Sequence, residues 1–422
     1  MKLIGKVSVS CLSVITMASA QKLSVPFEKY RLDNGFTVIL HEDHRLPIAA
    51  VDLWYRVGAK DEPVKRSGFA HLFEHLMFMG TWRAPEGEFD QLMEKGGGAN
   101  NATTSSDRTN YFSWGPANLL PTLLWLEADR LEHLGDAMNQ KKLDLQREVV
   151  RNERRQSYEN EPYGMAELEI DGLMYPEGHP YHIPVIGTHE DLVAATVDDV
   201  KGFFATWYVP NNCSLVVAGD FDPASTKKLI ASLFGSLPKK PEPPHRDAAP
   251  VRLEKKKEKT LTDANVQFPR VSMVWHSPKA MAPGDAECDI IGKILSDGII
   301  SRLQKRLIYD ETLANSVMAF QQSQRLGSTM PFGKVSSRTT APQWHEALCV
   351  GPISVFPTRL IVELEVGIPD DMRLHYLLPP KTSNRPPITM APTPAHMGTL
   401  TVCLSLADTS RGPSFTRVVS LV

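Results

Sequence analysis

KYRLDNGFTVIL, residues 29–40, indicates the fold class of this chain. Two runs of strand-forming residues flank the turn sequence DNG, which predicts a β-hairpin over residues 28–42. A third strand is predicted over residues 49–57. The pattern then becomes helical over residues 67–79, and again from about residue 117 to residue 134, where leucines recur at helical spacing. Strands followed by helices predict an α+β fold.

The length of 422 residues predicts two domains, because a single hydrophobic core rarely grows so large. The segment RVSMVWH at residues 270–276 echoes AVDLWYR at residues 50–56, and both segments lead through a loop into a helix. This echo predicts two homologous domains, each a mainly antiparallel sheet packed with helices. Residues 21–237 form the first domain in this interpretation and residues 251–328 the second. A proline-rich linker over residues 238–250 joins them.

The last 94 residues differ in composition from the rest. Twelve of the 32 prolines lie in residues 329–422, where neither helical nor strand periodicity persists. We therefore expect an irregular tail, either disordered or translated from a shifted reading frame, and an incomplete second domain.

The first 20 residues have the features of a secretory signal peptide. Lys2 and Lys6 precede a mostly apolar run over residues 7–17, and Ala18-Ser19-Ala20 supplies a small-residue cleavage site. The run is about half of the roughly 20 residues that cross a bilayer, so stable membrane insertion is not expected. The sequence therefore predicts an exported protein, periplasmic or secreted.

Charge and cysteine content exclude two classes of function. The net charge is −3 and the longest basic run, at residues 255–257, has glutamate on both sides, so no nucleic-acid partner is expected. Four cysteines at positions 213, 288, 349 and 403 lack any metal-binding spacing, and we expect buried thiols there.

The segment His71-Leu72-Phe73-Glu74-His75 contains the candidate metal-binding and catalytic residues. On a helix its three polar side chains share one face, because residues three and four positions apart are neighbours. Two neutral imidazoles at this spacing can bind one Zn²⁺, and a catalytic zinc needs a third protein ligand and an open position for water. Glu74 is then close enough to take a proton from that water. The alternative is a pair of hydrogen-bonded histidines at the edge of a core.

The third ligand is sought on a helix over residues 143–153. Leu143, Gln146, Val150 and Glu153 fall on one stripe of it, whereas Glu148 falls with arginines on a charged stripe. Glu153 is therefore predicted to point inward. The alternative is that Glu153 pairs with Arg154 or Arg155 on the surface.

Residues 68–81, GFAHLFEHLMFMGT, resemble the zinc motif of the pitrilysin/insulinase family of metallopeptidases, particularly its processing-peptidase-like bacterial branch. Residues 147–155 resemble the second metal segment of that family, whose third zinc ligand corresponds to Glu153. Residues 96–104 are similar to the edge strand with which the family binds an extended peptide, a role that falls here to Asn101 and Ala102. Further similarity at residues 180–187 and 207–212 extends the resemblance from Tyr30 to about Phe320.

The resemblance implies a zinc-dependent endopeptidase of peptides or unfolded polypeptides, with zinc-bound water activated by Glu74. Gln146 departs from the family, which often has an acidic residue at this position. The family also closes its chamber with a second homologous half that supplies an Arg and a Tyr, and neither can be placed in this chain. A homologous second subunit or a homodimer is therefore expected. The alternatives are a non-catalytic peptide-binding subunit of a heterodimeric peptidase and a truncated product without a stable fold.

Overall fold

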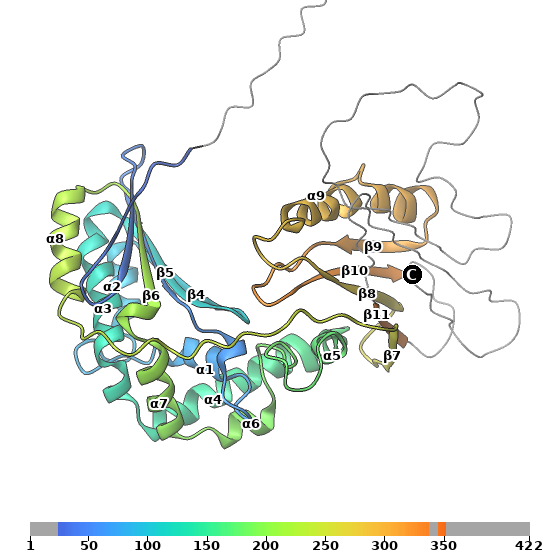
Figure 1. The fold of residues 1–422 in the computed structure, drawn as a ribbon, viewed down its shortest axis with the longest axis horizontal. Coiled ribbons are helices and arrows are strands. Elements are labelled where there is room, and N and C mark those ends of the chain that lie inside the picture. The colour runs from blue at the N-terminus through green and yellow to red at the C-terminus, as the bar shows by residue number, and fades with distance from the viewer. Residues whose placement is uncertain (1–23, 337–344, 352–422) are drawn as a thin grey trace, which may run out of the picture.

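The computed structural model describes residues 24–336 and 345–351, which form two units that each combine a sheet with helices (Figure 1). The first unit has a six-stranded sheet in the order β1-β2-β6-β3-β5-β4. Its strands are β1 (Glu28–Arg31), β2 (Thr37–Glu42), β3 (Ile48–Tyr55), β4 (Ala99–Thr104), β5 (Thr109–Pro116) and β6 (Cys213–Gly219). Only the β2–β6 pair is parallel, so the predicted mainly antiparallel α+β fold is confirmed.

The hairpin predicted over residues 28–42 is present. β1 and β2 pair from Glu28 opposite Leu40 to Arg31 opposite Thr37. Gly35 takes a φ of +91° in the turn, a conformation that favours glycine. The buried Asn34 amide donates to the carbonyl oxygen of Phe234 at 2.7 Å, which ties the turn to a distant helix.

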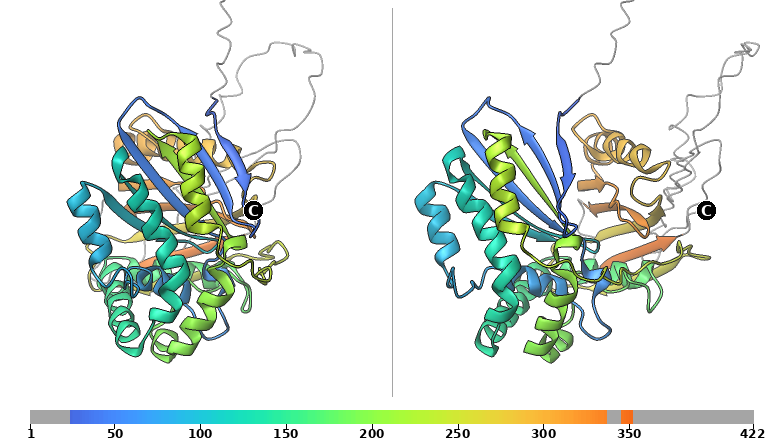
Figure 2. Two further views of the ribbon diagram at one scale, coloured as in Figure 1. Left: turned by 90° about the vertical axis from the view of Figure 1, so that its left-hand side faces the viewer. Right: turned by 60° about the vertical axis from the view of Figure 1, so that its left-hand side comes forward.

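The described part of the first unit contains eight α-helices. They are α1 (Phe69–Leu76), α2 (Glu88–Gly96), α3 (Leu120–Ala137), α4 (Gln140–Arg154), α5 (Gly164–Met174), α6 (His189–Ala194), α7 (Val197–Trp207) and α8 (Pro223–Phe234). Helices α2, α3 and α8 cover the sheet face that is turned away from the second unit (Figures 1 and 2). The central strand β3 alternates accordingly, because every second residue from Ala49 to Tyr55 is buried.

The second unit has a five-stranded sheet in the order β7-β11-β8-β10-β9. The strands are β7 (Lys257–Thr262), β8 (Arg270–Ser277), β9 (Ala314–Ala319), β10 (Ser328–Ser336) and β11 (His345–Gly351), and α9 (Asp285–Ser296) lies between β8 and β9 in the chain. β10 lies between β8 and β9, as β5 lies between β3 and β4. The two echoing segments, residues 50–56 and 270–276, thus fall largely on strands at matching places in their sheets, which supports the predicted duplication.

The predicted start of an irregular tail at residue 329 is wrong. β10 runs through Ser336 between two partner strands, and β11 joins the same sheet as far as Gly351. Pro331 contributed to this wrong prediction. Proline has no backbone N–H to donate to a neighbouring strand, so it usually marks an edge strand or the end of a strand. Here it pairs opposite Val274 and its carbonyl oxygen accepts from Phe320 N at 3.2 Å, so the sheet continues through it.

Several predictions concern segments without regular structure or without a description. Residues 238–250, the predicted linker, contain no helix or strand. The predicted signal peptide and residues 352–422 lie outside the described residues. Cys213 and Cys288 are buried free thiols, as expected. Within the described ranges, none of the helices combines the length and the apolar character that crossing a bilayer requires.

Asp107, at the tip of the β4–β5 hairpin, joins the two units. Its Oδ1 accepts from the hydroxyl of Tyr181 at 2.7 Å, and its Oδ2 accepts from the backbone N–H of Arg325 in the second unit at 2.9 Å. The ammonium of Lys60 lies 3.6 Å from Oδ1 and 3.1 Å from the carboxylate of Asp61. Because Lys60 and Asp61 are almost fully buried, this ammonium depends on the two carboxylates for its charge balance.

Replacing Asp107 by alanine is predicted to destabilise the chain. The change leaves a buried ammonium with one carboxylate and two donors without their acceptor, so the free energy of unfolding should fall by about 2–4 kcal/mol. Urea denaturation at pH 7 measures this. The exposed Asp247→Ala variant is the control and should stay within about 0.5 kcal/mol of wild type. Equal midpoints for both variants would contradict the role of Asp107.

Asp171 on α5 predicts a dependence of stability on pH. Burial raises the pKa of its carboxyl to about 7, with His182 opposing and Glu167 adding to the rise. The unfolded carboxyl has the ordinary value of 3.8 and ionises first, so this group destabilises the fold progressively as pH rises from about 4 to about 7. Asp171→Asn should therefore raise the Tm by several degrees at pH 8 and leave it unchanged at pH 4, measured by thermal denaturation.

Candidate metal centre

The orientation of α1 is set by its apolar side. Phe69, Leu72, Phe73 and Leu76 are fully buried. The Phe73 ring lies 4.5 Å from that of Tyr208 and 5.4 Å from that of Phe203 on α7. With 3.6 residues per turn, the side chains at positions 71, 74 and 75 then project on another side of the helix.

The start of α1 is held by a residue that the sequence did not single out. The buried carboxylate of Glu62 accepts from the backbone N–H of Gly68 at 3.1 Å and of Ala70 at 2.8 Å. Burial raises the pKa of this carboxyl well above its usual value, and the backbone hydrogen bonds oppose the rise. Gly68 has a φ of +80°, and a Cβ there would meet the carbonyl oxygen of Ile186 at 2.7 Å, so this position requires glycine.

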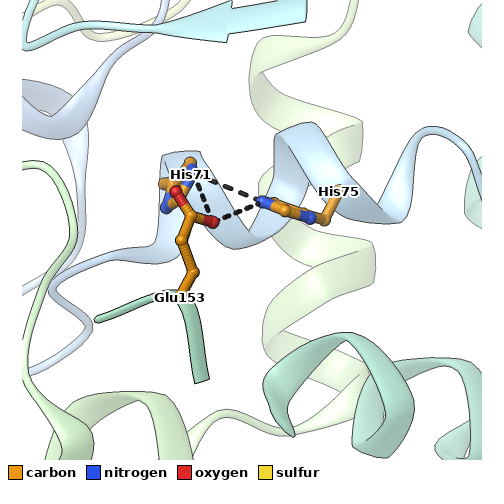
Figure 3. Close-up of side chains that lie close together, drawn as sticks. All are labelled: His71, His75 and Glu153. Atoms are coloured by element: carbon orange, nitrogen blue, oxygen red, sulfur yellow. Dashed lines mark hydrogen bonds and ion pairs between the residues drawn. The ribbon is translucent and has the colours of Figure 1, made fainter. Parts of the chain in front are cut away.

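The three predicted ligands meet between α1 and α4 (Figure 3). The Nε2 atoms of His71 and His75 are 3.3 Å apart. The Oε2 atom of Glu153 lies 3.6 Å from Nε2 of His71 and 3.3 Å from Nε2 of His75. Two imidazoles from one helix and a carboxylate from another thus form a triangle of donor atoms.

α4 presents Glu153 as its apolar stripe predicts. Leu143 and Val150 are buried against the first unit, and Glu153 lies on the same side with a partly exposed side chain. Gln146, on this stripe as well, places its Nε2 2.7 Å from the sulfur of Met79. The stripe therefore faces α1.

The surface alternative for Glu153 is not observed. Arg154 pairs with Glu159 at 3.1 Å, and Arg155 donates to the amide oxygen of Asn152 at 2.5 Å. On the charged stripe, Glu148 accepts a hydrogen bond from Arg151. Both arginines next to Glu153 thus have other partners.

The triangle has the size of one face of a zinc tetrahedron. Zinc binds histidine nitrogen and carboxylate oxygen at about 2.0–2.1 Å, and in a tetrahedron this separates neighbouring ligand atoms by about 3.3–3.4 Å. The observed separations of 3.3, 3.3 and 3.6 Å agree with that value. The donor set of two imidazoles and one carboxylate is also typical of catalytic zinc, with the fourth corner left for water.

The electrostatics favour the protonation states that metal ligands need. Burial lowers the pKa of His71 to about 4, against the opposing charge of Glu153. The hydrogen bond from His75 lowers the pKa of Glu153. At neutral pH the imidazole of His71 is therefore unprotonated and Glu153 is a carboxylate.

Glu74 lies beside the triangle and has a partner of its own. Thr104 at the end of β4 donates from its hydroxyl to Oε2 of Glu74 at 2.5 Å. Burial raises the pKa of Glu74, and the bond from Thr104 and the nearby His75 limit the rise. Sequence reasoning did not assign Thr104, although it ends the quoted segment at residues 96–104. Its contact with Glu74, 30 positions away, arises only in the tertiary structure.

Asn101 and Ala102 lie on β4, whose one partner among the described strands is β5, so that β4 forms one edge of the first sheet. The Asn101 side chain is exposed, and its Oδ1 accepts from the backbone N–H of Ala102 at 2.8 Å. Ala102 is buried on the side that carries Thr104. The same strand thus contains the predicted peptide-binding residues and the partner of Glu74.

Comparisons with known families cover both units. The family model described as insulinase, peptidase family M16, matches residues 37–174. The model described as the peptidase M16 inactive domain matches residues 194–348. The second match ends within β11, well beyond residue 328.

Curated relatives include proteins named as zinc proteases. Zinc protease PqqE from Helicobacter pylori is 29% identical over 330 residues, which span 77% of this chain and 73% of that protein. The mitochondrial-processing peptidase subunit beta from Lentinula edodes is 25% identical over 310 residues, which span 69% of this chain and 64% of that protein.

Solved structures share the two-unit fold. The crystal structure of a protease from Helicobacter pylori superposes with a TM-score of 0.68 at 27% identity and covers 75% of this chain and 76% of that chain. The peptidase M16 inactive domain from Pseudomonas fluorescens superposes with a TM-score of 0.61 at 16% identity, covering 74% of each chain, which is a likeness of fold alone.

The purified chain is predicted to bind one equivalent of zinc. Glu153→Gln removes the ligand charge from the triangle and should weaken zinc binding at least about tenfold. Competition with a fluorescent chelator measures the affinity. Glu148→Gln, on the charged stripe of the same helix, is the matched control and should bind zinc like wild type. Equal zinc affinities for the two variants would exclude Glu153 as a ligand.

Proposed function

Since this chain belongs to the insulinase, or M16, family of zinc metallopeptidases, we propose that it is a zinc-dependent endopeptidase with His71, His75 and Glu153 as metal ligands and Glu74 as general base. The donor triangle with a partly buried carboxyl beside it supports this proposal. A scaffold has no physical need to hold two close imidazoles, a ligand carboxylate and a second acid together.

Zinc, when bound, supplies a Lewis acid for the peptide carbonyl and lowers the pKa of water. Glu74 would accept the proton of the attacking water and return it to the leaving amine. Its raised pKa suits both steps, because a base whose pKa lies closer to the working pH can also give the proton back. His71 and His75 belong to the same helix as Glu74, so the metal position and the base are kept in one rigid element.

The substrate would bind in extended form along β4. The free edge of that strand offers backbone groups for strand addition, with Asn101 and Ala102 as the contact residues. Pairing at Ala102 requires the Asn101 side chain to release the Ala102 N–H that it occupies. Recognition through backbone groups suits peptides and unfolded polypeptides, because a folded protein has few unpaired strands to offer.

We also propose export and a partner subunit. The predicted signal peptide at residues 1–20 supports export to the periplasm or the medium. The relative from Lentinula edodes is by name a subunit of a processing peptidase, which supports assembly with a homologous second chain or with another copy.

The second candidate function is peptide binding without cleavage, as a partner-dependent subunit. The match of residues 194–348, which include most of the second unit, to a domain described as inactive favours it, since that part of the chain would then contribute structure and no catalytic residue. The two candidates share β4 and differ in whether Glu74 is used.

Glu74→Gln is predicted to abolish hydrolysis and to retain zinc. The amide keeps the size of the side chain and cannot take a proton, so kcat should fall by at least about 100-fold. Cleavage of a quenched fluorescent peptide by the zinc-loaded chain measures this.

Glu94→Gln on the exposed side of α2 is the control and should cleave like wild type. Residual hydrolysis in Glu74→Gln at the wild-type rate would contradict the proposal. Zinc and peptide binding without cleavage in wild type would favour the binding subunit.

A further inference from the structure

We propose that Thr104 is a positioning residue for Glu74. Because Thr104 lies on β4, the strand along which the peptide would pair also orients the general base. This inference rests on the proposed function. It adds a residue from outside the zinc motif and a link between peptide binding and the orientation of the base.

The contact is short and specific. The Thr104 hydroxyl donates to Oε2 of Glu74 at 2.5 Å, in a partly buried setting. A glutamate side chain has three rotatable bonds, so its carboxylate has several positions open to it unless a partner holds one oxygen. With Oε2 held by Thr104, Oε1 has no hydrogen-bond partner among the described residues and can accept the proton of the attacking water.

Thr104 is well placed to hold another group. It is β-branched and lies in a strand, which restricts its χ1 angle. It directly precedes the hairpin turn at residues 105–108, where Ser105 N donates to Arg108 O at 2.8 Å. The Thr104 hydroxyl thus comes from a short, fixed segment at the end of β4.

The hairpin is held from both sides. Within the first unit, Ala59 N donates to Ser105 O at 3.1 Å and Lys60 N donates to Ser106 O at 3.0 Å. From the second unit, Gln324 Nε2 donates to the Ser106 hydroxyl at 3.2 Å, and Arg325 N donates to Asp107. The second unit therefore acts on the base indirectly, because it fixes the hairpin from which Thr104 reaches Glu74.

The same strand joins this contact to the substrate. Ala102 and Thr104 lie two residues apart on β4 and project toward α1, whereas Asn101 and Thr103 project to the opposite face. A peptide that pairs along the free edge of β4 would further restrain the strand that carries Thr104. The orientation of Glu74 would then be best defined when an extended peptide is bound.

Thr104→Val and Thr104→Ser test this role. Valine keeps the shape of threonine and lacks the hydroxyl, whereas serine keeps the hydroxyl. In the zinc-loaded full chain, kcat for a quenched peptide should fall between about tenfold and about 100-fold in Thr104→Val, because the base is displaced. KM should change less than about twofold, and Thr104→Ser should keep kcat within about threefold of wild type.

Thr206→Val is the control, since it makes the same change at an exposed position on α7, and it should keep kcat within about threefold of wild type. Wild-type kcat in Thr104→Val would overturn the inference. Equal losses in the serine and valine variants would overturn it too, because they would point to packing instead of the hydroxyl.

Crystal structures of wild type and Thr104→Val separate this inference from the proposed function, because they need no turnover. The Glu74 carboxylate should occupy one position in wild type and leave it, or occupy several, in Thr104→Val. An unmoved carboxylate would overturn the inference even in an active enzyme. Absence of zinc or of cleavage in wild type would instead contradict the proposed function, with the test of Thr104 intact.

Discussion

The site depends on how α1 packs against the core. Burial of an aromatic side chain such as Phe73 contributes about 1.5–3 kcal/mol, and α1 buries four large apolar side chains within eight residues. Rotating the helix by one residue would expose part of this apolar surface and turn polar side chains of the same helix, such as Glu74, toward the core. The apolar packing thus fixes the direction of both imidazoles and of Glu74, and the remaining parts of the site are arranged around that direction.

Around this helix, neighbouring elements complete a polar site at the edge of the core. Glu62 caps its start, α4 brings Glu153 to the two imidazoles, and β4 brings Thr104 to Glu74. The contributors are far apart in sequence, and each is held by its own element. Such preorganisation keeps polar groups in place before a substrate arrives, which lowers the cost of reaching the transition state.

The two units share a plan but differ at their centres. In each, a central strand is followed by a helical segment and then by a hairpin whose second strand returns beside the central one. The first unit carries the donor triangle between α1 and α4. Among the described residues, a cluster of metal-binding side chains occurs only there. The second unit contributes contacts to the β4–β5 hairpin, so in the proposed chemistry it holds this hairpin in position and supplies no reacting group.

Local sequence patterns alone determined many of the structural elements of this protein and the directions of its site residues. The DNG turn, the helical spacing of HLFEH and the apolar stripe that ends in Glu153 predicted the hairpin, the shared face and the inward carboxylate, because each follows from the geometry of one element. Proline content, by contrast, misplaced the end of the second sheet, since the partners of β10 compensate for Pro331. Only the tertiary structure decided that the three donor atoms lie 3.3–3.6 Å apart, that Glu62 caps α1 and that Thr104 meets Glu74. Distances between elements depend on how the whole core packs, and a linear pattern does not contain them.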